Sequence, residues 1–180
     1  MAVTYDSLSG AATGFGSSNT FPHTCSGADR MLLAWVYGDR GDASSYGVSA
    51  MSYAGVALTQ VGTWGDGIRW GECWRLVAPA TGANNVVAAY NNGGGVCKQF
   101  VRCTSWNGVD QTTPLGDLAS ATADSVGPAT VNVTSPGDLI VDCAAIATIT
   151  LTLSMGADQT LIENTTSTGG VAIFDGYAGA

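Results

Sequence analysis

The sequence has few charged residues, and basic residues are the scarcest of these. Only 11% of the 180 residues are charged, and 14 acidic against 6 basic side chains give a formal net charge of -8. Nucleic-acid binding needs clustered Lys and Arg, which displace counterions from the phosphates. The basic residues are instead scattered along the chain: Arg30, Arg40, Arg69, Arg75, Lys98 and Arg102. We therefore expect no nucleic-acid partner.

Segments that would direct the chain to a membrane are also missing. Residues 1–6 have no basic region followed by an apolar run, so we expect no secretory signal. The most apolar stretch, residues 144–153, is too short and too rich in Thr to span a bilayer. We therefore expect no membrane partner and synthesis in a cytoplasm.

The cysteines lack the pattern of a disulfide or zinc scaffold. Their number is odd, 5, and no two have CxxC spacing. Cys97 and Cys103 would share a face of a regular strand, but no close second pair completes a zinc site. The sequence therefore predicts buried free thiols and a reducing environment for folding. The residues concerned are Cys25, Cys73, Cys97, Cys103 and Cys143.

Residues that could carry catalysis are scarce as well. The only histidine, His23, would share a strand face with Cys25, so a Cys–His pair is conceivable. A turn or strand-edge histidine beside a buried thiol is the simpler interpretation. The only two glutamates, Glu72 and Glu163, are interpreted as solvated surface charges rather than as half of a glycosidase pair. With no Gly-x-Ser-x-Gly motif, we expect no catalytic residue and no enzymatic activity.

Three aspartates in Gly-rich loops are the only candidates for a cation site. Asp39, Asp42 and Asp66 could hold Ca²⁺, but none fits an EF-hand loop. Aspartate is also an ordinary turn residue. We predict neither a metal nor a cofactor, with a structural cation as the alternative.

The chain does contain many short β-like runs separated by Gly and Pro, and it has no sustained helical stripe. This pattern predicts an all-β fold, an antiparallel, jelly-roll-like β-sandwich, in one domain over residues 1–180. Nearly continuous apolar runs at 31–36 and 139–141 predict central strands. The predicted strands are 3–8, 31–37, 48–53, 56–64, 69–77, 85–90, 96–105, 130–134, 139–147, 160–164 and 171–177.

Two aromatic residues stand out for their position. Trp64 and Trp70 flank a Gly-Asp-Gly turn, so they are predicted to be an exposed pair that could stack on a sugar. Trp35 and Trp74 are predicted to lie in the core. For most of the aromatic residues, packing in the core or at an interface is the favoured role.

The run from Trp106 to Gly116 is the most specific local pattern. It joins the end of a β-rich segment to an Asn-Gly turn and then to a Pro-Leu-Gly exit. This order predicts a fixed corner of a sandwich and a packing loop rather than a substrate site. The residues of the predicted loop are Trp106, Asn107, Gly108, Asp110, Pro114 and Leu115.

Four blocks together carry a resemblance to a known group of proteins. They span residues 52–59, 74–86, 106–116 and 135–142. In this order they resemble β-sandwich domains on the virion surface of tailed bacteriophages, including head decoration, head-fibre and tail-associated proteins. The resemblance covers roughly residues 1 to 175 and brings no catalytic residues with it.

The resemblance implies a structural virion protein, made in the host cytoplasm, that is a capsid decoration (cement) or head-fibre subunit. Its expected partners are copies of itself and the major capsid protein or other virion proteins. The alternative is a carbohydrate-binding or adhesin-like module that uses Trp64 and Trp70 on a glycan. Similar chains continue with another strand after residue 177, so a neighbouring subunit is expected to cover an open sheet edge here.

Overall fold

The structure is a computed structural model, and every element in the residues that it describes is a β-strand. The described residues are 2–13, 16–38, 46–65, 69–91, 98–116, 118–121, 139–146, 159–166 and 172–178. Contacts divide the chain into two compact units, residues 1–131 and 132–180, which are described separately. The single domain over 1–180 stays a prediction. Within the described ranges, no helix is long and apolar enough to cross a membrane.

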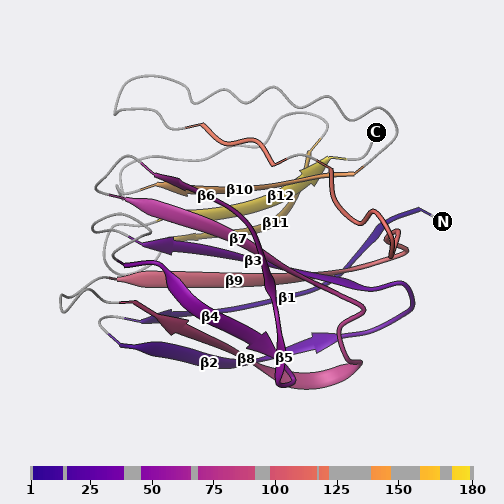
Figure 1. The fold of residues 1–180 in the computed structure, drawn as a ribbon. Helices are drawn as coiled ribbons and strands as arrows, with labels where there is room; N and C mark the ends of the chain where they lie inside the picture. Colours follow the sequence, from indigo (N-terminus) through magenta and orange to yellow (C-terminus); the bar gives the residue numbers. More distant parts are fainter. Residues whose placement is uncertain are drawn as a thin grey trace. The chain divides into compact units, whose positions relative to one another are not determined.

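The first unit consists of two antiparallel sheets (Figure 1). The five-stranded sheet has the order β1-β9-β3-β7-β6, and the four-stranded sheet has the order β2-β8-β4-β5. The strands are β1 (Thr4–Thr13), β2 (Ser18–Cys25), β3 (Met31–Gly38), β4 (Val48–Tyr53), β5 (Val56–Ala57), β6 (Thr59–Gly65), β7 (Trp70–Val77), β8 (Gly82–Tyr90) and β9 (Gln99–Asn107).

The pairing of these strands confirms the predicted jelly-roll-like sandwich. β1 pairs with β9, β2 with β8, β3 with β7 and β4 with β5, so the chain is arranged as one long hairpin that is rolled up. Successive strands therefore alternate between the two sheets over much of the roll. This alternation is the jelly-roll solution for covering one face of each sheet.

The rolled hairpin closes at a tight turn between β4 and β5. Ala54 and Gly55 both have positive φ, 51° and 79°. Positive φ at both central residues is the backbone of a type I′ turn, whose twist matches that of the flanking strands. The predicted strands at 48–53 and 56–64 leave the two residues of this turn between them, and Gly55 supplies one of its two left-handed residues at no steric cost.

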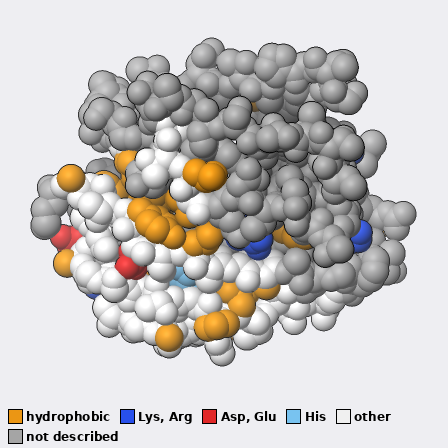
Figure 2. All heavy atoms as spheres, turned by 180° about the vertical axis from the view of Figure 1, so that it is seen from behind, with side chains coloured by type: hydrophobic (Ala, Val, Ile, Leu, Met, Phe, Trp, Pro, Cys, Tyr) orange, Lys and Arg blue, Asp and Glu red, His pale blue; other side chains and the backbone are white. Residues whose placement is uncertain are grey.

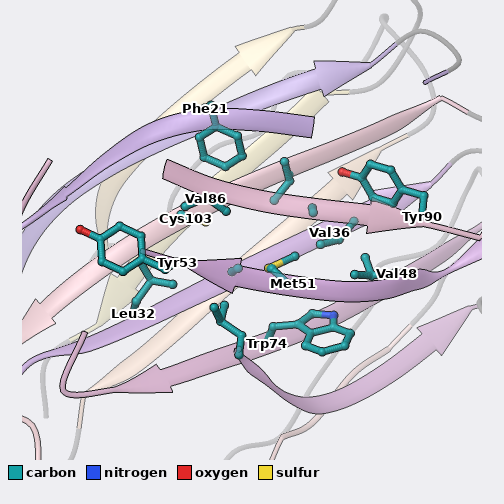
Figure 3. Packing of buried hydrophobic residues seen from close by; sticks show 14 of the residues in the cluster. Phe21, Leu32, Val36, Val48, Met51, Tyr53, Trp74, Val86, Tyr90 and Cys103 are labelled. Carbon is teal, nitrogen blue, oxygen red and sulfur yellow. The ribbon is translucent and has the colours of Figure 1, made fainter. Parts of the chain in front are cut away.

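The core lies between the two sheets and receives side chains from both (Figure 3). Phe21, Met51, Tyr53 and Val86 come from the four-stranded sheet, and Trp74 comes from the five-stranded sheet. The four residues from the four-stranded sheet alternate along their strands with exposed or half-buried ones, which is the period-two pattern of a half-buried sheet. Three of the described cysteines, Cys25, Cys73 and Cys103, are buried thiols, as predicted, whereas Cys143 is half-buried.

β3 is buried on both faces, which confirms the prediction of a central strand. Leu32 and Val36 belong to the core between the sheets, whereas Leu33 and Trp35 point to the opposite face and are only 2% and 9% exposed. β3 lies between β9 and β7 in the five-stranded sheet. A strand with both faces covered needs a continuous apolar run.

One strand of the sandwich was not predicted. β2 places Asn19 and His23 on its buried side together with Phe21 and Cys25, and it carries Pro22 at its centre. Two polar residues among the four inward positions hide the apolar alternation. Proline is tolerated here because β2 is an edge strand that pairs only with β8.

The second unit contains one antiparallel sheet with the order β10-β12-β11. Its strands are β10 (Ile140–Ile146), β11 (Gln159–Thr166) and β12 (Ala172–Ala178). The prediction that the 139–141 run lies in a central strand is wrong, because β10 is at an edge of this sheet. β12 is the central strand and is paired on both sides, so it presents no open edge. The predicted strand at 130–134 lies outside the described residues.

Candidate functional site

The only histidine lies in a polar network between β1 and β2, at one edge of the sandwich. His23 is 2% exposed. Its Nδ1 atom is 2.7 Å from the Ser9 hydroxyl oxygen, and its Nε2 atom is 3.5 Å from that of Ser7. Because β1 and β2 belong to different sheets, these contacts connect the two layers.

Hydroxyl groups extend the network from the ring to a carboxylate. The hydroxyl oxygens of Ser7 and Ser105 are 2.9 Å apart. Ser105 donates to Asp6 Oδ2 at 2.7 Å, and the backbone N–H of Ser26 donates to the same oxygen at 2.8 Å. Asp6 thus reaches His23 through two serines rather than directly. These hydrogen bonds connect residues of the strands β1, β2 and β9.

Burial and hydrogen bonding keep the imidazole of His23 uncharged and the carboxylate of Asp6 charged. Burial lowers the pKa of His23 to about 4, against a smaller raising effect from Asp6. For Asp6, burial raises the pKa, but the hydrogen bonds from Ser26 and Ser105 outweigh it and leave the pKa lowered. At neutral pH the network therefore contains a neutral imidazole and an ionised carboxylate.

The arrangement is poorly suited to nucleophilic catalysis. A serine nucleophile needs a base whose pKa is near the working pH, and the pKa of His23 is about 4. Cys25 shares the inward face of β2 with His23, as the spacing predicted, but the hydrogen bonds of the ring go to Ser7 and Ser9. Burial also raises the pKa of Cys25, so it remains a thiol. The network stabilises the sandwich edge.

A second buried polar group lies in the core, where the sequence did not predict one. Glu72, predicted to be a solvated charge, is 1% exposed. Its carboxylate accepts hydrogen bonds from the Val48 N–H at 3.0 Å, Gln60 Nε2 at 3.1 Å and Trp74 Nε1 at 2.6 Å. Burial nevertheless raises the pKa of Glu72, because these donors offset only part of the desolvation. Its three donors come from three different strands.

Trp64 and Trp70 do not form an exposed pair. The prediction that Trp70 is exposed is wrong, since it is 1% exposed and belongs to the core. Gly38 lies opposite Trp70 on β3, and a Cβ atom there would be 2.2 Å from the indole. The missing side chain makes room for the ring. Trp64 is half-buried, with its ring centroid 6.2 Å from that of Trp35.

The predicted packing loop packs largely against its own sandwich. Trp106 is 1% exposed, and its indole N–H donates to the Thr104 hydroxyl at 3.0 Å. Asp110 is exposed, and its carboxylate accepts the backbone N–H groups of Thr112 and Thr113 at 2.7 and 3.0 Å. The remaining predicted loop residues, Asn107, Gly108, Pro114 and Leu115, are half-buried. The carboxylate of Asp110 thus caps the turn of this loop, and Trp106 is buried and not available to a partner.

The largest feature left without a role is the outer face of the four-stranded sheet. None of the residues in β2, β4, β5 and β8 is Asp, Glu, Lys or Arg. The side chains on this outer face are short and exposed or half-buried. We call this surface the neutral face, and its residues are Ser18, Thr20, Pro22, Thr24, Ala50, Ser52, Ala57, Ala83, Asn85, Val87 and Ala89.

The neutral face could be found in the sequence only in part. Its β8 residues alternate with core residues such as Val86 and Ala88, which identifies the strand. Its β2 residues belong to the strand that was not predicted. The described surface seen in Figure 2 is likewise mostly white and orange, with small areas of charge. The low content of charged residues was therefore the one feature of the sequence that pointed to a neutral face.

The described residues contain no group of three or more His, Cys, Asp or Glu side chains that could hold a metal ion. The candidate cation ligands Asp39, Asp42 and Asp66 lie outside the described residues. Comparison with protein-family models, with curated proteins and with solved structures found no match.

Proposed function

We propose that this protein is a non-enzymatic structural subunit of a tailed-bacteriophage virion, a capsid decoration (cement) or head-fibre protein that packs through its neutral face. The observation that carries the packing role is the absence of charged residues from the four-stranded sheet of a chain with a net charge of -8. The assignment to a virion rests on the resemblance of four sequence blocks to virion-surface domains of tailed bacteriophages.

The free energy of contact between two acidic proteins depends on which of their surfaces meet. A chain with this net charge repels other acidic surfaces at long range, which keeps it soluble. Close contact is cheapest where no charged group must be desolvated. A flat face of short, uncharged side chains meets that condition, and it loses little side-chain entropy when it is covered. Many such modest contacts in a repeated shell add up through avidity.

The carbohydrate-binding alternative has less support from the geometry. Stacking on a sugar needs an exposed aromatic face, and Trp70 is 1% exposed. Trp64 alone is half-buried and packs near Trp35. These two aromatic residues thus pack within the sandwich and do not form a sugar-stacking platform.

The test is co-sedimentation of the purified protein with phage heads from the genome that encodes it, prepared without this protein. We expect saturable binding that free glycans do not displace and that Val87→Arg, at the centre of the neutral face, weakens at least tenfold. Thr59→Arg places the same charge on an exposed position of β6 and should leave binding unchanged. Failure to bind heads, or full displacement by a glycan, would overturn the proposal.

A further inference from the structure

We infer that the neutral face pairs with the neutral face of a second copy of this chain, sheet against sheet, about a two-fold axis. This inference rests on the proposed packing function and names a partner for the same surface. The occupant follows from three properties of the face: its charge, the arrangement of its side chains and its area.

Charge favours a second copy over a charged partner. The four strands carry no acidic or basic side chain that could form an ion pair with another protein, because none of their residues is Asp, Glu, Lys or Arg. The surface that complements an uncharged face is another uncharged face, and a second copy supplies it. Two copies that meet here bring no like charges of this sheet together. The rest of the net charge of -8 still repels, so salt should strengthen the pair.

The side chains of the face form rows that a second sheet can cover. In the central row, Thr20 of β2 lies opposite Val87 of β8, and Val87 lies opposite Ser52 of β4. Val87 is 37% exposed, and it is the largest apolar side chain of the face. In an isologous contact a residue near the axis meets its own copy. Val87 is therefore the expected centre.

The free edge of the same sheet is less suitable for pairing. β2 carries Pro22, which cannot donate to a strand ladder. The Thr24 carbonyl of β2 also lies within hydrogen-bond distance of the hydroxyl groups of Ser7 and Ser105. Proline on an edge strand hinders the addition of another strand. Association through the face is therefore favoured over association through this edge.

The area sets the strength of the contact. Standard strand spacing and rise give the face on the order of 450 Å² per copy, or about 900 Å² in total. Specific, stable interfaces bury about 1,200 Å² or more. The isolated pair should therefore be weak and depend on protein concentration, and a lattice would strengthen it through multivalency.

The first experiment is sedimentation velocity of the full chain over a range of protein and salt concentrations. We expect the weight-average sedimentation coefficient to rise with protein concentration and to rise further with salt. Val87→Arg and Val87→Glu should both return it to the monomer value, and Thr59→Arg should not. If either Val87 variant fails to fold, Thr20→Arg places a charge on the same row. A monomer at every concentration, or association that all these variants retain, would overturn the inference.

The second experiment locates the contact. Packed sheets lie about 10 Å apart, so a thiol cross-linker that spans about this distance should join two copies of Val87→Cys into a covalent dimer. Thr59→Cys and the unmodified chain measure the background from the native cysteines. Equal yields in all three proteins would overturn face-to-face pairing.

The inference and the proposed function fail in different ways. A protein that stays monomeric but still binds heads through Val87 contradicts the pairing and leaves the virion role in place. A protein that dimerises through Val87 but does not bind heads supports the pairing and contradicts the virion role.

Discussion

The hydroxyl oxygen of Ser9 lies 2.7 Å from Nδ1 of His23, and this contact joins an edge strand of one sheet to an edge strand of the other. A buried imidazole in this position must stay neutral to remain in a largely desolvated site. The edge of the sandwich is therefore held by a group that can titrate, and its stability should depend on pH.

The contribution of His23 to the free energy of unfolding should fall as the pH is lowered below neutral. The folded-state pKa of His23 is about 4, below its ordinary 6.5, so the unfolded chain binds more protons between these values. The stabilisation is complete above the ordinary pKa and is lost as the pH falls toward the folded value, by on the order of 3 kcal/mol. Chemical denaturation at about pH 7.5 and about pH 5 measures most of this loss, about 2 kcal/mol, because the remainder is lost only as the pH falls to about 4.

The matched control is His23→Asn, which keeps a polar atom near the position of Nδ1 but does not titrate. Relative to the wild type, we expect this variant to become more stable as the pH falls over the same window, because only the wild type loses the contribution of His23. Asp6, whose pKa is lowered, does not alter the slope in this window, because its stabilisation is complete above its ordinary pKa of 3.8 and is lost only below that value. Equal pH slopes in the two proteins would contradict the assignment to His23.

Glu72 should give the opposite slope. Its folded-state pKa is raised above the ordinary 4.5 because of burial, so its contribution is most favourable at low pH and is lost as the pH rises through the folded value. Relative to the wild type, Glu72→Gln should therefore become more stable as the pH rises from about 4.5 to about 7.5. Urea denaturation of both proteins at each pH checks this, and a constant difference would contradict it.

Removing the acceptor altogether should be costly at every pH. Glu72→Ala leaves the N–H groups of Val48 and Trp74 buried without the oxygens that now accept them. Each unsatisfied buried donor costs about 1–3 kcal/mol. We expect a loss of about 2 kcal/mol or more in urea denaturation, and a neutral effect would contradict the described contacts.

The glycine opposite Trp70 should tolerate no side chain. A Cβ at Gly38 would lie 2.2 Å from the indole of Trp70, which is fixed in the core. At Gly62 the nearest atom is instead Cδ2 of Leu118, the end of a flexible and exposed side chain, at 2.5 Å. Gly38→Ala should cost about 1–3 kcal/mol and Gly62→Ala clearly less. Equal losses in thermal or urea denaturation would contradict this difference.

The turn at Ala54 offers a stabilising substitution. Ala54 has φ of 51°, in the left-handed region that alanine adopts with strain and asparagine adopts more readily. Ala54→Asn should raise the free energy of unfolding by about 0.5–1 kcal/mol. The same substitution at Ala57, in β5, should give no gain. A loss of stability at Ala54 would contradict the turn geometry.

The sequence predicted those parts of the fold in which the inward positions are apolar. β3 and β7 were placed closely because their apolar residues alternate or form a continuous run. β2 was missed because Asn19 and His23 point inward, and their partners Tyr90 and Ser9 come from distant strands. A local sequence pattern cannot predict hydrogen bonds between side chains that lie so far apart in the chain.

The candidate site was harder to predict for the same reason. Burial of Glu72 depends on donors from β4 and β6, and burial of Trp70 depends on Gly38 across the sheet. These relationships exist only once the strand register is fixed. The only sign of the neutral face in the sequence is the low content of charged residues. Composition alone does not show that the uncharged residues gather on one sheet.

The proposed virion role is tested most directly by the number of copies of this chain in purified virions, counted by quantitative mass spectrometry against the major capsid protein. We expect a fixed ratio that matches the symmetry of the head lattice and that survives washing at high salt. Absence of the chain from complete virions, or a ratio that varies between preparations, would contradict the account.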